Sequence, residues 1–206
     1  MIFSPFEAWE KVTTAQRGFF WVLFTYLLPL LVIALGIEGW LLTRLGEKQG
    51  ELGFLVKVPV DLALRYTAAY GVLLLVGIAV SAKFLGLASE SFNVRASYFQ
   101  TWLVMAYGFS PIILARILDG IPQINTWVCW AIGVAASASV MYHGVGAVLR
   151  PDQTKGFGLY LISIIVILLV SGVIHFVALE VLHGKLLQPR SAQVQQTELF
   201  ALARSS

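Results

Sequence analysis

Residues 106–114 read AYGFSPIIL, a stretch that carries a glycine and a proline three residues apart inside a long apolar run. Pro111 lacks a backbone N–H and clashes with the carbonyl of Tyr107, four residues earlier, so a helix through this stretch should kink there. Gly108 removes side-chain bulk where the kink opens, and Ser110 can hydrogen-bond a freed carbonyl. The stretch therefore predicts a kinked helix in a membrane.

The composition also indicates a membrane protein. Of the 206 residues 58% are hydrophobic and 12% are charged, and the mean hydropathy is +0.82, whereas a soluble domain carries about 25% charged residues. A helix needs about 20 apolar residues to cross the hydrocarbon core. Stretches of suitable length without Asp, Glu, Lys or Arg occur at 18–37, 66–82, 96–115, 120–149 and 156–179. None alternates as barrel strands do, so we expect an all-α polytopic membrane protein with five transmembrane helices.

The first residues predict a short helix of a different kind. Ser4, Pro5 and Glu7 are an N-cap, a first-turn proline and a capping-box glutamate. Phe6 and Trp9 then recur at helical spacing, opposite charged residues, which favours an amphipathic helix anchored by these two side chains in the membrane interface. The expected organisation is an interfacial helix at 1–17, a five-helix transmembrane domain at 18–183 and a polar C-terminal tail at 184–206.

Small residues predict how the spans pack. Gly133 and Ser137 form a small-xxx-small pair, and residues 135–139 read AASAS, five small residues in succession. Such residues let helix backbones approach closely. We therefore expect the fourth span at the centre of the bundle, against the kinked third span. The fifth span is bulky on all sides and should face lipid.

The sequence contains few residues that could form a catalytic or metal-binding site. Cys129 is the single cysteine, and the histidines lack the spacing of a zinc motif. His175, Glu180 and His183 allow a weak proton or metal cluster near one interface, but interfacial anchoring explains them equally well. The scattered basic residues form no nucleic-acid patch. We expect no catalytic, cofactor-binding or metal-binding residue, and hence no enzyme.

Three short segments resemble one known family. Residues 4–12 read SPFEAWEKV, residues 97–102 read SYFQTW before AYGFSP, and Tyr142, His143 and Gly144 precede a short basic turn. These segments are similar to the entry, the third span and the end of the fourth span of bacterial Yip family (Ypt/Rab-interacting) membrane proteins. The resemblance implies five closely packed helices, a cytoplasmic N-terminus in a bacterial inner membrane, and a non-enzymatic organising role.

The orientation is weakly encoded. Of the fourteen Lys and Arg residues, six lie on the N-terminal side of the spans and eight on the other side, which decides nothing under the positive-inside rule. The loops after the second and fourth spans are shorter and denser in charge, and this favours an N-terminus inside the cell.

Three functions remain open at this point. The first is a membrane organiser or adaptor that contacts the lipid bilayer and, through lateral helix contacts, other membrane proteins or itself. The second is an accessory subunit of a larger complex, with Trp127 and Trp130 as contact surface. The third is a small permease or channel for transport, gated at the Pro111 kink, which should have a polar cavity lined by Tyr107, Ser110, Ser137 and Ser139.

Overall fold

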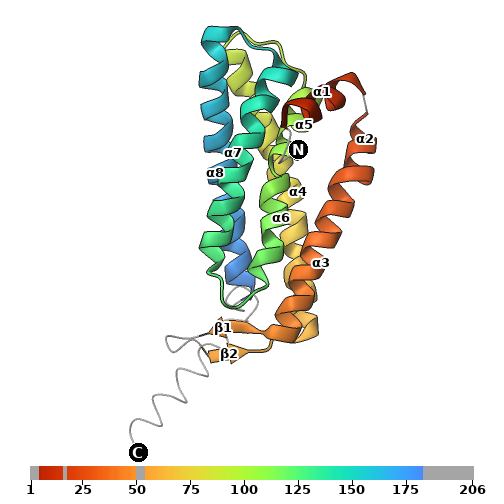
Figure 1. Cartoon of the computed structure of the whole chain (residues 1–206), viewed down its shortest axis with the longest axis vertical. Coiled ribbons are helices and arrows are strands. Elements are labelled where there is room, and N and C mark those ends of the chain that lie inside the picture. The colour runs from red at the N-terminus through yellow and green to blue at the C-terminus, as the bar shows by residue number, and fades with distance from the viewer. Residues whose placement is uncertain (1–4, 16–17, 50–53, 183–206) are drawn as a thin grey trace, which may run out of the picture.

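The computed structural model describes residues 5–15, 18–49 and 54–182, and it has the predicted all-α membrane architecture (Figure 1). In this part of the chain five helical segments are long and apolar enough to cross a membrane, at Phe19–Leu45, Val60–Ser91, Tyr98–Asp119, Thr126–Leu149 and Thr154–Leu182. Their consecutive directions alternate, so the loops gather at two ends of one bundle. The predicted tail at 184–206 lies outside the described residues.

The helices begin and end as follows. The short N-terminal helix is α1 (Pro5–Thr14), and the first span consists of α2 (Phe19–Val22), a π-helical turn at Leu23–Leu27 and α3 (Leu28–Leu45). The second span is α4 (Val60–Ser91), the third is α5 (Tyr98–Gly108) with α6 (Ser110–Asp119), the fourth is α7 (Thr126–Leu149) and the fifth is α8 (Gln153–Leu182). Between α3 and α4 the chain forms a small antiparallel hairpin, β1 (Glu47–Gln49) with β2 (Phe54–Val56), in which Glu47 is paired with Val56.

The AYGFSPIIL stretch is where the third span changes direction. α5 ends at Gly108 and α6 begins at Ser110, with Phe109 as the shared residue at φ −77° and ψ −14°. The Ser110 hydroxyl donates to the carbonyl oxygen of Ala106 at 3.2 Å, which satisfies a carbonyl next to the break. The same hydroxyl lies 2.7 Å from that of Tyr26 in the first span. The break is therefore fixed by a neighbouring helix.

The centre of the bundle is the third span, and the prediction that the fourth span lies there is wrong. Within its most apolar 18-residue stretch, 83% of the third span is buried, against 28% to 44% for the other four spans. The small residues of α7 mislead because they permit close approach on any side, while α7 uses only the side with Gly133 and Ser137. Ala135 and Ser139 are exposed.

The fifth span faces outward, as predicted, but on one side only. α8 packs along α4 and α7 and buries one side, with Ser163, Ile167, Ser171 and Ile174 turned inward. Its other side, with Ile165, Leu169 and Phe176, is exposed. The sequence looked equally apolar on all sides because a side that packs against helices and a side that faces lipid are both apolar in a membrane.

Candidate functional site

The most concentrated polar chemistry in the bundle surrounds Arg116, near the C-terminal end of α6. Its guanidinium forms a bidentate ion pair with Glu38 of α3, in which Nε donates to Oε2 at 3.1 Å and Nη2 donates to Oε1. Nη1 also lies 2.5 Å from Oδ2 of Asp119. The three side chains are only 4%, 2% and 6% exposed, so these charges lie inside the protein.

Two tyrosines of α4 complete the surroundings of the arginine. The Tyr66 hydroxyl donates to Glu38 Oε1 at 2.9 Å and accepts a hydrogen bond from Arg116 Nη2. The guanidinium carbon lies 4.3 Å from the centre of the Tyr70 ring. A planar guanidinium can pair with a carboxylate in two places and stack on an aromatic face at once, whereas a lysine ammonium cannot. The position therefore requires arginine.

The fifth span reaches the cluster through His175. Arg116 Nη1 lies 3.1 Å from His175 Nδ1. A guanidinium only donates, so Nδ1 must accept, and the ring proton is on Nε2, which faces the hydroxyl of Thr126 at 3.3 Å. This hydrogen-bonding arrangement indicates that the His175 imidazole is neutral. Trp127 packs edge-on against the same ring, with 4.8 Å between the ring centres.

The cluster joins five elements at one end of the bundle. It combines α3, α4, α6, the start of α7 and α8 through one arginine, two carboxylates, two tyrosines and one neutral histidine. A cavity of about 290 Å³ lies beside it, at the end with the 120–125 turn, and Glu38, Tyr66 and Asp119 line it. The arginine is outnumbered by carboxylates beside this cavity.

The chemistry of this cluster is that of a structural cross-link. Its carboxylates are occupied by the guanidinium, and it contains no serine or cysteine beside a base. Among the described residues, no three or more His, Cys, Asp or Glu side chains are arranged to hold a metal ion. Removing one partner of a buried ion pair lowers the free energy of unfolding by about 3–5 kcal/mol, because the other charge is then left alone in an apolar environment.

The structure places the predicted packing residues in two groups. At the contact of the third and fourth spans, a Cβ added to Gly133 would lie 2.9 Å from the Cα of Ile112, and one added to Gly108 would lie 2.5 Å from Met141 Sδ. Pro111 is buried, and so is Ser137, whose hydroxyl has no hydrogen-bond partner among the described residues. Gly108 and Gly133 lie where the third and fourth spans approach each other closely.

The second group joins α1 to the bundle. Trp9 is fully buried, and its indole N–H donates to the carbonyl oxygen of Val140 at 3.0 Å. Its ring occupies the space over Gly144, where a Cβ would come within 3.0 Å of it, and packs edge-on against Tyr107. Trp9 was predicted as an anchor in the lipid interface, but in the structure it holds α1 on α7.

The remaining predicted residues lie elsewhere. Tyr142 is 60% exposed and packs against Tyr160 of α8. Phe6 lies in α1, and its side chain is outside the described residues, as is His183. The weak alternative of a cluster of His175 with Glu180 and His183 is not tested, since His183 lies outside the described residues, and His175 itself contacts Arg116 and Thr126. Searching for spans as charge-free intervals missed Glu38, because such an interval ends at the first charge, whereas α3 continues to Leu45.

Comparison with known proteins identifies the family. The chain matches the family model described as the Yip1 domain over residues 1–185. No curated protein matches the chain, and no solved structure matches it. The matched region contains all five spans and the Arg116 cluster. The chain therefore belongs to the Yip1 domain family, the family that its SPFEAWEKV, SYFQTW and YHG segments resemble.

Proposed function

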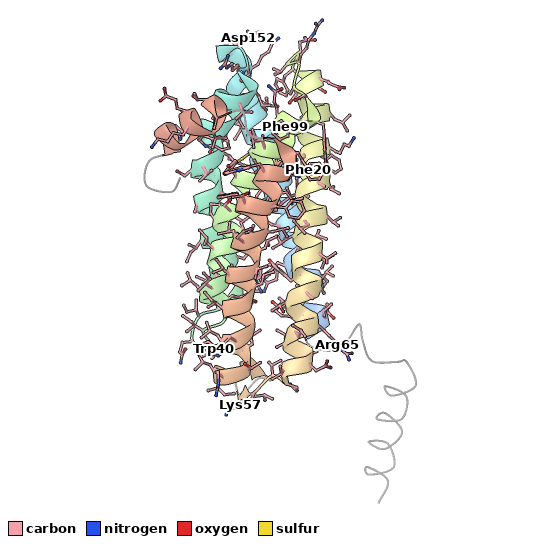
Figure 2. All side chains as sticks on the ribbon, turned by 90° about the vertical axis from the view of Figure 1, so that its right-hand side faces the viewer. Phe20, Trp40, Lys57, Arg65, Phe99 and Asp152 are labelled. Atoms are coloured by element: carbon pink, nitrogen blue, oxygen red, sulfur yellow. The ribbon has the colours of Figure 1, made fainter. Side chains whose placement is uncertain are left out.

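We propose that this Yip1-domain protein is a non-enzymatic membrane organiser that binds other membrane proteins, or a second copy of itself, through a lateral groove between α3 and α4. The observation that carries the proposal is the groove itself. It has a volume of about 520 Å³, and every described residue that lines it belongs to one of these two helices. Figure 2 shows α3 and α4 side by side, with Trp40 and Arg65 marking the level of the groove.

The floor of the groove is made of small residues. Gly36 and Gly39 lie on α3, and Ala63 and Thr67 lie on α4. A Cβ on Gly39 would lie 2.9 Å from the methyl carbon of Thr67, so the helices are close at the floor, whereas a Cβ on Gly36 would meet nothing within 4 Å. The Thr67 hydroxyl already donates to the Ala63 carbonyl. The floor therefore consists of small residues, and the hydroxyl of Thr67 on it is already hydrogen-bonded within its own helix.

The rim of the groove is bulky and apolar. Trp40 is 59% exposed on α3, and Val60 and Leu64 are 73% and 68% exposed on α4. In lipid, burial of apolar area gives helix association no advantage, so helices associate through van der Waals contact. Small residues between large ones form a surface on which a partner helix can make such contact closely. This supports recognition of a transmembrane helix.

The permease alternative receives less support. Tyr107 and Ser110 lie inside the bundle in contact with Tyr26, and Ser139 is on an exposed side of α7. The cavities at the two ends of the bundle and between α3 and α4 are lined by other residues. Three of the four residues expected around a transport path are thus buried, the fourth is exposed, and none of them lines these cavities.

Gly36→Leu tests the proposal, since it adds bulk to the groove at a position where a Cβ meets no atom within 4 Å. Photo-crosslinking from position 64 in native membranes should yield a discrete adduct in the wild-type chain, and Gly36→Leu should reduce it about tenfold, the effect of overfilling a packed contact by 1–3 kcal/mol. The mass of the intact particle in mild detergent tells a second copy from a different protein.

Gly146→Leu is the matched control, because Gly146 is exposed on α7 and a Cβ there also meets nothing within 4 Å. This variant should leave the adduct unchanged. An adduct that persists in Gly36→Leu, or crosslinking that is equal from every side of the bundle, would contradict recognition through the groove.

A further inference from the structure

A second large cavity lies at the opposite end of the molecule from the Arg116 cluster. Its volume is about 780 Å³, and it is enclosed by α1, the start of α5 and the end of α7. In Figure 2 this is the end marked by Phe99 and Asp152. Since α5 begins and α7 ends here, the cavity lies at the level where membrane helices meet the headgroup region.

The walls of this cavity are divided by polarity. Arg95 and Arg150 lie on one part of the lining, and Phe99, Leu103 and Val148 provide an apolar wall. The apolar residues belong to α5 and α7, within the spans, and the arginines belong to the loops beyond them. A ligand that fits both parts carries a charged group at the interface and a hydrocarbon part toward the membrane.

The charged residues that the structure describes in the lining are both positive. No Asp or Glu is among the described residues that line the cavity. Neither arginine has an ion pair with a described carboxylate: Asp152 pairs with Lys155 at 3.7 Å and Asp61 pairs with Arg65. Glu90 lines an adjoining hollow together with Arg95. Two guanidinium groups therefore face the cavity with their charge available to a ligand.

The backbone at Arg150 supports a role for its side chain. Arg150 ends α7 in the left-handed conformation, at φ 47° and ψ 51°. Glycine is the favoured residue at this position of a helix end, because a side chain there strains the backbone. An arginine at such a position is costly to the fold, and its side chain lines the cavity.

We propose that this cavity binds the headgroup of an anionic phospholipid. The phosphate lies between Arg95 and Arg150, where guanidinium groups form paired hydrogen bonds to phosphate oxygens. The acyl chains leave along Leu103 and Val148. This site is separate from the α3–α4 groove, and it would make the lipid a fixed component of the α1, α5 and α7 corner.

The test measures which lipid the full-length protein retains. The protein is reconstituted into nanodiscs of equal parts phosphatidylglycerol and phosphatidylcholine with the same acyl chains, and native mass spectrometry identifies the lipids that remain bound. We expect retention of phosphatidylglycerol over phosphatidylcholine. Arg95→Gln combined with Arg150→Gly should reduce that preference about 25-fold, about fivefold for each basic residue. Arg150→Gly removes the charge and relieves the backbone, so the variant should remain folded.

One control variant and one competition experiment decide the result. Arg44→Gln with Arg65→Gln removes the same charge from the opposite end, and it should leave the preference unchanged. The proposal is overturned if both double variants lose the preference equally, if the wild-type protein retains both lipids alike, or if excess inorganic phosphate displaces the bound lipid, because the site would then bind free phosphate.

Discussion

At the scale of single residues, the structure depends most on Arg116. Its guanidinium contacts Glu38, Asp119, Tyr66, Tyr70 and His175, one residue or more from α3, α4, α6 and α8. A charge so enclosed is stabilised only by these partners, since water cannot replace them. Each partner is therefore expected to matter mainly through the arginine.

Arg116→Met should lower the free energy of unfolding by about 3–5 kcal/mol, because Glu38 and Asp119 are left as buried charges without a cation. Glu38→Gln alone should be costly as well, and the double variant should be less destabilised than the sum of the two, since the charges disappear together. Denaturation in detergent micelles measures all three.

Arg65→Met is the control for this comparison. Arg65 also forms an ion pair, with Asp61 at 3.0 Å, but the two side chains are 65% and 74% exposed. Loss of an exposed pair should cost under about 1 kcal/mol. Equal losses in Arg65→Met and Arg116→Met would mean that burial of the Arg116 cluster contributes nothing.

At the scale of elements, the sequence predicts what depends on local properties, and it misses what depends on which helix faces meet. The five spans and the change of direction at Pro111 follow from local properties, namely apolar length and the missing N–H of proline. Whether α7 or the third span is central depends on which faces meet, and hydropathy does not encode this in a membrane. The Glu38–Arg116 pair joins residues 78 positions apart, so no local pattern reveals it. The amphipathic spacing of Trp9 predicted contact with lipid. Its partner in the structure is Gly144, and a glycine gives no pattern from which a contact can be predicted.

Gly144→Val should release α1 from the bundle, because the added side chain occupies the space of the Trp9 ring. The backbone amides of residues 9–14 should then exchange with solvent at least about tenfold faster, as expected for an element that opens locally. Hydrogen exchange with mass spectrometry measures this directly.

Gly146→Val is the paired variant, two residues along α7 at an open position. It should leave the exchange of α1 unchanged. If α1 stays protected in Gly144→Val, then Trp9 is not what holds it.

At the scale of the whole molecule, the bundle has two chemically different ends. One end carries α1 and the arginine-lined cavity, and the other carries the hairpin and the Arg116 cluster with its cavity (Figure 1). Five spans place these ends on opposite sides of a membrane. The direction in which the molecule is inserted therefore decides which side each cavity meets.

We expect the N-terminal end to face the cytoplasm, following the denser positive charge of its short loops. A cysteine introduced at Lys57 should then react with a membrane-impermeant maleimide added to intact cells, whereas one at Thr14 should react only after the membrane is permeabilised. Both positions are exposed. The native Cys129 is buried and should give little background. The reverse labelling pattern would invert the orientation.

The distance along the chain between Glu38 and Arg116 also affects how the protein is made. Glu38 leaves the ribosome 78 residues before its partner, so the first two spans enter the bilayer with an acidic group that nothing yet neutralises, and such a group is costly in lipid. Their final packing has to wait for the third span to arrive. A nascent chain that stops before residue 116 thus retains the Glu38 carboxylate without its cation. Such an unpaired polar group in a membrane helix is a feature that membrane quality control can recognise.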